Sequence, residues 1–271
     1  MNSRRERYEV FRRLHESGCF VIPNPWDLGS ARILTQLGFS ALATTSCGFA
    51  WTLGRRDNQV TLDEALGHFR QIAAGVEVPV NADFEGGFAI APDQVAANVS
   101  AAVATGIAGI SIEDSTGDGS GPLFDFALAV DRVKAARRAI DASGTGVLLT
   151  GRSEGFIVGR PDLGETIRRL TAYADAGADC LYAPGIRRMS DIVAVVNAVS
   201  PKPVNVLVGS DFATVEELAH AGVRRISLGP ALALAAWTGF VAAAREIAEQ
   251  ETFTCLSRSV TFADINQAFD G

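Results

Sequence analysis

The chain has 271 residues, of which 48% are hydrophobic and 20% charged, and its formal net charge is −7. This balance excludes disordered and fibrous proteins, and the length suits one α/β barrel, which needs about 250 residues. The acidic charge argues against nucleic acid or an anionic membrane surface as a partner. Four cysteines lie far apart with no CxxC spacing, and no apolar run approaches the roughly 18 residues of a membrane helix. We therefore expect a cytoplasmic protein with reduced thiols.

The first residues predict a helix with one solvated face. Tyr8, Phe11 and Leu14 recur at helical spacing, while arginine and glutamate alternate around them. We expect the three apolar side chains to turn inward and the charged ones to face water.

Four segments along the chain share one pattern, in which a helix-like stretch is followed by a glycine and then by a short apolar run. The glycines are Gly38, Gly106, Gly177 and Gly222. Glycine tolerates the left-handed conformation that ends a helix, and the short apolar run is typical of a strand buried on both faces. Four more apolar runs fit between these segments. The sequence therefore predicts eight strands, near residues 20, 42, 80, 110, 148, 181, 205 and 226.

The gaps between the strands are long enough for helices. Pro92–Thr105 places Val95, Val99 and Val103 on one stripe, and Thr214–Glu217 has the sequence of a capping box. No GxGxxG follows the first strand, which removes the usual reason to expect a dinucleotide-binding fold. We predict a single α/β domain, a (β/α)₈ TIM-type barrel of parallel strands with an N-terminal helix. The C-terminal extension, residues 251–271, would contact a neighbouring subunit.

Polar and charged residues follow the predicted strands where each one ends, and in such barrels the reactive groups gather at these ends. Charged side chains there are costly unless they meet a counter-charge or a metal. Asp83 and Glu113 would converge from adjacent strands, and their oxygen atoms suit Mg²⁺ (or Mn²⁺). Arg152, on the next strand, would hold a substrate carboxylate with its bidentate fork. The alternative is that these charged groups pair with one another.

Five motifs in order along the chain carry a resemblance to a known family. They are NPWD…SAR (Asn24 to Arg32), TSCGF…LGRRD (Thr45 to Asp57), NADFEGGF (Asn81 to Phe88), GISIEDS (Gly109 to Ser115) and GRSEGFI (Gly151 to Ile157). On these strand ends, from about Phe20 to Ala244, the chain resembles the isocitrate lyase/phosphoenolpyruvate mutase superfamily.

The resemblance implies a barrel whose mouth is shared by a metal and a substrate. Asp83 would ligate the metal directly or through water, and Glu113 would lie in the same coordination shell. Asn81 is the third predicted metal-binding residue. The resemblance implies that the Ser46-Cys47-Gly48 turn binds the substrate carboxylate. Further substrate-binding positions are predicted at the strand ends, at Trp26, Thr45, Glu154 and Asn205. The catalytic residues would be Asp57, Arg152 and Glu113.

The chemistry implied by the resemblance is stabilisation of an enolate, in which a 2-oxo acid chelates Mg²⁺ while a C–C or P–C bond changes. The family also often exchanges its last helix between subunits. It therefore implies a homodimer or homotetramer here.

The sequence departs from the family pattern at two places. The metal motif often reads Asp-x-Asp, but its first position here is Asn81. The loss of one carboxylate would either weaken Mg²⁺ binding or be offset by a hydrogen bond from the asparagine to a metal-bound water. The family's lyases carry a Lys-Lys/Arg-Cys-Gly-His loop after the fourth strand, whereas residues 115–122 contain no cysteine, histidine or lysine. The glycine-rich part of this loop, residues 117–121, would either gate the site or form a surface turn.

Other reactive side chains do not replace the missing loop residues. We expect Cys47 to be a small buried side chain. His15, His68 and His220 fall in predicted helices and are expected to be structural or exposed.

These features predict a Mg²⁺-dependent C–C lyase or hydrolase that acts on a small 2-oxo or 2-hydroxy (di)carboxylate. A phosphoenolpyruvate/phosphonopyruvate phosphonomutase is the second hypothesis, with Gly229-Pro230 in the region where barrels commonly bind phosphate. A non-catalytic 2-oxo acid binding protein is the third.

Overall fold

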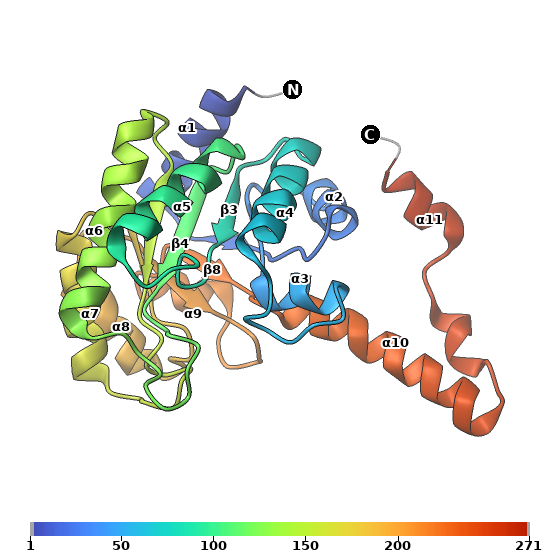
Figure 1. Cartoon of the computed structure of the whole chain (residues 1–271). Coiled ribbons are helices and arrows are strands. Elements are labelled where there is room, and N and C mark those ends of the chain that lie inside the picture. Colours follow the sequence, from blue (N-terminus) through green and yellow to red (C-terminus); the bar gives the residue numbers. More distant parts are fainter. Residues whose placement is uncertain (1–2, 270–271) are drawn as a thin grey trace.

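The computed structural model describes residues 3–269 and contains eight parallel strands in one barrel (Figure 1). The sheet order is β1-β8-β7-β6-β5-β4-β3-β2, and the Ala43 N–H donates to the Pro23 carbonyl at 3.0 Å where β1 meets β2. The strands lie where the sequence predicts them: β1 (Phe20–Ile22), β2 (Leu42–Ala43), β3 (Val80–Asp83), β4 (Gly109–Glu113), β5 (Leu148–Arg152), β6 (Cys180–Tyr182), β7 (Val204–Leu207) and β8 (Arg225–Ser227). The predicted (β/α)₈ fold is confirmed.

Helices surround the barrel, and their apolar stripes face it (Figure 1). In α5, the predicted stripe of Val95, Val99 and Val103 is buried, and the capping box at Thr214 and Glu217 opens α9. The helices are α1 (Arg4–Glu16), α2 (Leu28–Gln36), α3 (Ser46–Thr52), α4 (Leu62–Gly75), α5 (Pro92–Ala104), α6 (Phe126–Ser143), α7 (Leu163–Asp175), α8 (Met189–Val199), α9 (Val215–His220), α10 (Ala231–Gln250) and α11 (Phe262–Gln267), with a 3₁₀ turn η1 (Thr254–Arg258) before the last.

The N-terminal helix α1 closes one end of the barrel. Its residue Phe11 is fully buried, while Tyr8 and Leu14 are half-buried against the same cluster, as predicted. Phe11 reaches the start of β4, where a Cβ atom at Gly109 would lie 2.5 Å from its ring. Glycine is therefore required at the point where this aromatic ring enters the barrel. The other end, where the strands finish, stays open.

The last helix, α10, leaves the barrel and extends away from it, and the chain then turns back through η1 and α11 (Figure 1). Its side chains Trp237 and Phe240 are 38% and 63% exposed. By length and composition alone, α10 is long and apolar enough to span a membrane. One such helix is only weak evidence for a membrane protein. The sequence shows no long uninterrupted apolar run there, because Arg245 and Glu246 interrupt it.

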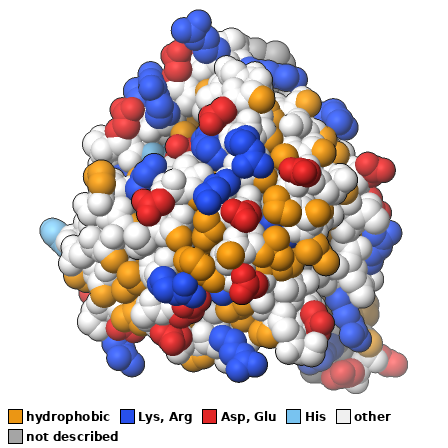
Figure 2. Space-filling model, turned by 60° about the vertical axis from the view of Figure 1, so that its left-hand side comes forward, with side chains coloured by type: hydrophobic (Ala, Val, Ile, Leu, Met, Phe, Trp, Pro, Cys, Tyr) orange, Lys and Arg blue, Asp and Glu red, His pale blue; other side chains and the backbone are white. Residues whose placement is uncertain are grey.

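Charge is distributed differently outside and inside the barrel. On the face shown in Figure 2, basic and acidic side chains are interspersed, with small apolar areas between them. Inside the open end, five carboxylates and two arginines, Arg152 and Arg225, line one cavity. Carboxylates are therefore gathered in this cavity, whereas the face in Figure 2 mixes the two signs of charge.

Candidate active site

A cavity of about 350 Å³ opens where the strands end. Most of the residues predicted from the sequence line it: Thr45, Ser46, Cys47, Asp57, Asn81, Asp83, Glu113, Arg152, Glu154 and Asn205. Two predicted substrate-binding residues, Trp26 and Gly48, do not line it. They lie behind the cavity wall, where a Cβ atom at Gly48 would come within 3.1 Å of the Trp26 Cβ.

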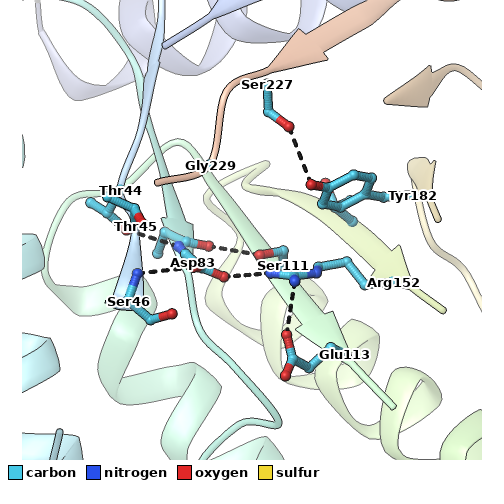
Figure 3. A network of polar contacts seen from close by, with 12 residues as sticks. Thr44, Thr45, Ser46, Asp83, Ser111, Glu113, Arg152, Tyr182, Ser227 and Gly229 are labelled. Carbon is cyan, nitrogen blue, oxygen red and sulfur yellow. Dashed lines mark hydrogen bonds and ion pairs between the residues drawn. The ribbon is translucent and has the colours of Figure 1, made fainter. Parts of the chain in front are cut away.

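Arg152 is the centre of the charged cluster (Figure 3). Its guanidinium forms ion pairs with Asp83 at 2.6 Å, with Glu113 at 3.1 Å and with Glu154 at 3.0 Å. Burial opposes the charge on Arg152, but the three carboxylates outweigh burial and hold its pKa above the ordinary value. The guanidinium is therefore charged whenever the protein is folded. The pairing of these groups with one another, which the sequence left open, is what the structure shows.

Neighbouring strands hold Asp83 in place. Its backbone N–H donates to the Thr44 hydroxyl at 2.9 Å, and its carboxylate accepts from the Ser46 N–H at 3.0 Å (Figure 3). The β4–β5 register sets Glu113 directly beside Arg152. The side chains therefore meet because parallel strands end at the same edge.

A buried network behind the site fixes Glu154. Asp114, which is 2% exposed, accepts from the Glu154 N–H at 2.8 Å and from the Tyr173 hydroxyl at 2.6 Å. Arg169 completes the network with an ion pair to Asp114 at 3.0 Å. Because each polar group here has a partner, the backbone that carries Glu154 is rigid.

Four carboxylates that face the cavity, those of Asp57, Glu85, Glu113 and Glu154, have raised pKa values. Loss of solvation and the nearby Asp83 carboxylate raise the pKa of Asp57, and burial with Asp83 and Asp57 raises the pKa of Glu85 to about 8. Burial also raises the pKa of Glu113 well above its usual range, although Arg152 opposes this. More negative charge is gathered here than one guanidinium compensates.

The donor atoms present fit a hydrated Mg²⁺ ion. The oxygens of Asp83 and Glu113 are of the kind that Mg²⁺ prefers, and Asn81 Oδ1 is buried with no hydrogen-bond partner. Arg152 bridges the two carboxylates, and within residues 3–269 no three His, Cys, Asp or Glu side chains form a metal-binding group. An ion here would therefore keep several waters. Asp83, Asn81 and Glu113 remain the predicted ligands.

Cys47 is half-buried on the cavity wall, with its Sγ 3.4 Å from the Thr45 hydroxyl. Burial raises the pKa of its thiol to about 11, so the thiol is protonated and is a poor nucleophile at neutral pH. All four cysteines are free, as expected from their spacing. Cys47 therefore does not take the place of a catalytic cysteine.

The three histidines do not line the cavity, whereas the loop after β4 reaches it with Ser115. His15 and His68 are buried in α1 and α4, and His220 is exposed in α9. Residues 115–122 form a closed turn, in which Ser115 bridges Leu123 and the Thr116 hydroxyl donates to the Gly121 carbonyl at 2.7 Å. Gating by this loop remains a prediction.

Among the lining residues that were not predicted as site residues are Glu85, Tyr182, Arg225 and Ser227. Glu85 lies in the loop after β3 with a positive φ of 48°. The others alternate inward on β6 and β8. The period-2 rule applied to those two strands would have pointed to them.

The comparisons with known proteins agree with this geometry. Residues 11–248 match the family described as phosphoenolpyruvate phosphomutase. The chain belongs to this family, and it is an enzyme of the isocitrate lyase/phosphoenolpyruvate mutase superfamily.

Three relatives show how far the similarity reaches. A solved structure from Burkholderia cenocepacia J2315, whose description names no reaction beyond lyase/mutase, is 45% identical with a TM-score of 0.96 and covers 99% of this chain and 98% of its own. The uncharacterized protein Rv1998c of Mycobacterium tuberculosis is 33% identical over 94% of both chains. Oxaloacetate decarboxylase of Bradyrhizobium diazoefficiens is 30% identical over 72% of this chain and 68% of its own.

Proposed function

We propose that the protein is a Mg²⁺-dependent carbon–carbon lyase or hydrolase for a small 2-oxo or 2-hydroxy dicarboxylate. The observation that supports this proposal is Arg152, a buried guanidinium that faces a cavity and is surrounded by carboxylates. A substrate carboxylate would bind in such a site by replacing one of the protein's own carboxylates as a partner of the Arg152 guanidinium.

Glu113 is the carboxylate that would exchange partners. It pairs with Arg152 at 3.1 Å, and it would turn to the hydrated Mg²⁺ when a substrate anion reaches the guanidinium. Arg152 would then stabilise negative charge that grows on the substrate oxygen as the C–C bond breaks. Mg²⁺, when bound, would supply Lewis-acid stabilisation of the same charge.

The size of the cavity and a relative together suggest which substrates to test first. A volume of about 350 Å³ suits a small dicarboxylate. Oxaloacetate is the first candidate, because the Bradyrhizobium relative is an oxaloacetate decarboxylase.

The test is a panel of 2-oxo and 2-hydroxy dicarboxylates, assayed for pyruvate or oxalate release with Mg²⁺ and with EDTA. We expect turnover of at least one C4 acid, its loss with EDTA and its loss in Arg152→Ala. Arg188→Ala is the matched control, because the Arg188 side chain is 78% exposed. Tight binding of a 2-oxo acid without any turnover would instead support the non-catalytic binding protein.

A phosphonomutase is the alternative function. The description of the matching family favours it, and Gly229 and Pro230 line the cavity. Conversion of phosphonopyruvate to phosphoenolpyruvate, followed by ³¹P NMR, would move the assignment to this reaction.

We also propose that α10 packs against a second copy in a homodimer or homotetramer in the cytoplasm. The helix leaves its own barrel with Leu234, Trp237 and Phe240 exposed, which favours a covered apolar face. Light scattering tests this: Phe240→Glu should lower the mass to that of a monomer. An unchanged mass would contradict the proposal.

A further inference from the structure

A chain of hydrogen bonds crosses three strands beneath the charged mouth. Arg225 Nε donates to Asn205 Oδ1 at 2.9 Å, and Asn205 Nδ2 donates to the Ser227 hydroxyl at 2.9 Å. The Ser227 hydroxyl then donates to the Tyr182 Oη at 3.3 Å (Figure 3). All four side chains are buried. The chain therefore runs from the barrel interior to the phenol at the cavity wall.

The direction of this chain is fixed at Arg225, because a guanidinium can only donate. Its NH1 faces His15 Nε2 at 3.3 Å, and its NH2 donates to the Thr150 hydroxyl at 3.1 Å. His15 Nδ1 lies 2.8 Å from the Phe11 carbonyl, which only accepts, so Nδ1 carries the hydrogen and Nε2 accepts from Arg225. The two links that follow run the same way, from Asn205 to Ser227 and from Ser227 to Tyr182.

The Tyr182 oxygen accordingly receives a hydrogen bond and keeps its own hydrogen free. No other protein group within residues 3–269 hydrogen-bonds to this hydroxyl. Burial, opposed by the nearby Arg152, raises the pKa of Tyr182 to about 12, so the phenol is protonated at neutral pH. The site holds a donor with no acceptor in the protein.

Tyr182 also lies beside the residue that would bind the substrate. It is the register neighbour of Arg152 across β5 and β6, and the guanidinium carbon is 5.1 Å from the centre of its ring. In Figure 3 its hydroxyl and the Arg152 guanidinium both point toward the side of the barrel that carries Asp83. The Ser111 hydroxyl, which also lines the cavity, instead donates to the Ala82 carbonyl at 3.2 Å.

We propose that Tyr182 is the proton donor of this site, and that Arg225, Asn205 and Ser227 are the positioning residues that aim its hydrogen at the substrate. This inference rests on the proposed lyase function. When the C–C bond breaks, its electron pair stays on the product as an enolate. The Tyr182 O–H bond breaks, a C–H bond forms at the former bond carbon, and the phenolate takes a proton from water. Ser227 and Arg152 stabilise the phenolate in between.

The test follows the protonation of carbon in D₂O, with the full chain and Mg²⁺. Exchange of the methyl hydrogens of pyruvate, read by ¹H NMR, reports the donor without requiring C–C cleavage. Decarboxylation of 3-methyloxaloacetate reports whether deuterium enters one face of the product. We expect Tyr182→Phe to slow exchange about 100-fold and to lose the facial preference. Oxalate affinity should change less than fivefold, which shows an intact site.

Variants along the chain test positioning. Ser227→Ala should slow exchange about 10-fold with little change in oxalate affinity. Ser227→Thr, which keeps the hydroxyl, should restore the rate. If Ser227→Ala is unchanged, the positioning role is wrong. If Glu85→Gln rather than Tyr182→Phe abolishes the facial preference, the donor is Glu85 and the proposal is wrong.

The outcomes separate this inference from the lyase function. Wild-type exchange that depends on Tyr182, without cleavage of any dicarboxylate, would support the donor and overturn the lyase. Cleavage that survives Tyr182→Phe with full facial preference would overturn the donor and support the lyase. A wild-type protein that does neither would overturn both.

Discussion

Arg152 and Arg225 both line the cavity of the barrel, and their surroundings are opposite. Arg152 at the mouth contacts three carboxylates. Arg225, one layer deeper, hydrogen-bonds only to the neutral side chains of Asn205, His15 and Thr150, and it forms no ion pair with any residue in the range 3–269. The charge of Arg152 is compensated locally, while that of Arg225 is not.

The difference shows what each arginine can do. Arg152 can exchange one carboxylate for another, so it suits the binding of an anion. Arg225 has no anion to exchange, and its N–H groups are committed to fixed acceptors. A buried charge without a counter-ion is costly, so its hydrogen bonds must offset that cost. Arg225 therefore serves to organise side chains, and Arg152 to bind substrate.

The largest effect is expected at Arg152. Arg152→Ala removes the anion-binding group and should lower kcat/KM by about 10³, the scale for losing a main charge-stabilising donor. Arg152→Lys keeps the charge but loses the fork, so its activity should lie in between. Steady-state kinetics on the best substrate of the panel measures both. Equal activity of the lysine variant and the wild type would show that only charge matters at this position.

Arg225 should affect stability more than substrate binding. Arg225→Met leaves the acceptors on Asn205 and His15 without donors, and we expect the free energy of unfolding to fall by about 2–3 kcal/mol. Urea unfolding measures this value. A more stable variant would show instead that the burial cost of the lone charge exceeds the value of its hydrogen bonds.

The barrel and the Arg152 cluster could both be predicted from the sequence, because each rests on local patterns. Glycine followed by an apolar run marks four of the strands, and apolar runs alone mark the other four. Parallel strands then bring their ends to one edge. Asp83, Glu113 and Arg152 therefore had to meet. Which of them pair, and at what distance, depends on side-chain packing that a pattern does not contain.

The Arg225 chain could not be predicted in the same way. Ser227 and Asn205 meet only because the β7–β8 register sets their strands side by side, and His15 comes from α1, more than 200 positions away from Arg225. The sequence places Arg225 in the predicted eighth strand but does not show which side chains it meets. The register of β7 against β8 brings Asn205 to Arg225, and helix α1 at the end of the barrel brings His15.

The smallest predicted effect concerns the pH dependence of stability. It tests whether His15, a hydrogen-bond partner of Arg225, is neutral in the folded protein. Burial, then the charge of Arg225, lowers the pKa of His15 in the folded protein to about 3. As the pH falls below about 6.5, His15 takes up a proton in the unfolded chain but not yet in the folded protein. This uptake favours the unfolded chain, so the free energy of unfolding decreases. Between pH 6.5 and pH 5 we expect a loss of about 1.5 kcal/mol from this residue.

His15→Gln tests this contribution, because glutamine can still accept from Arg225 but does not titrate. The stability of the variant should fall less steeply than that of the wild type from pH 6.5 to pH 5, by about 1.5 kcal/mol. The two proteins should have parallel stability curves above pH 7.5, where the histidine is neutral in both states. An equal slope at acid pH would mean that His15 is protonated in the folded protein. Arg225 would then face a second cation and would lose one of its three hydrogen-bond acceptors.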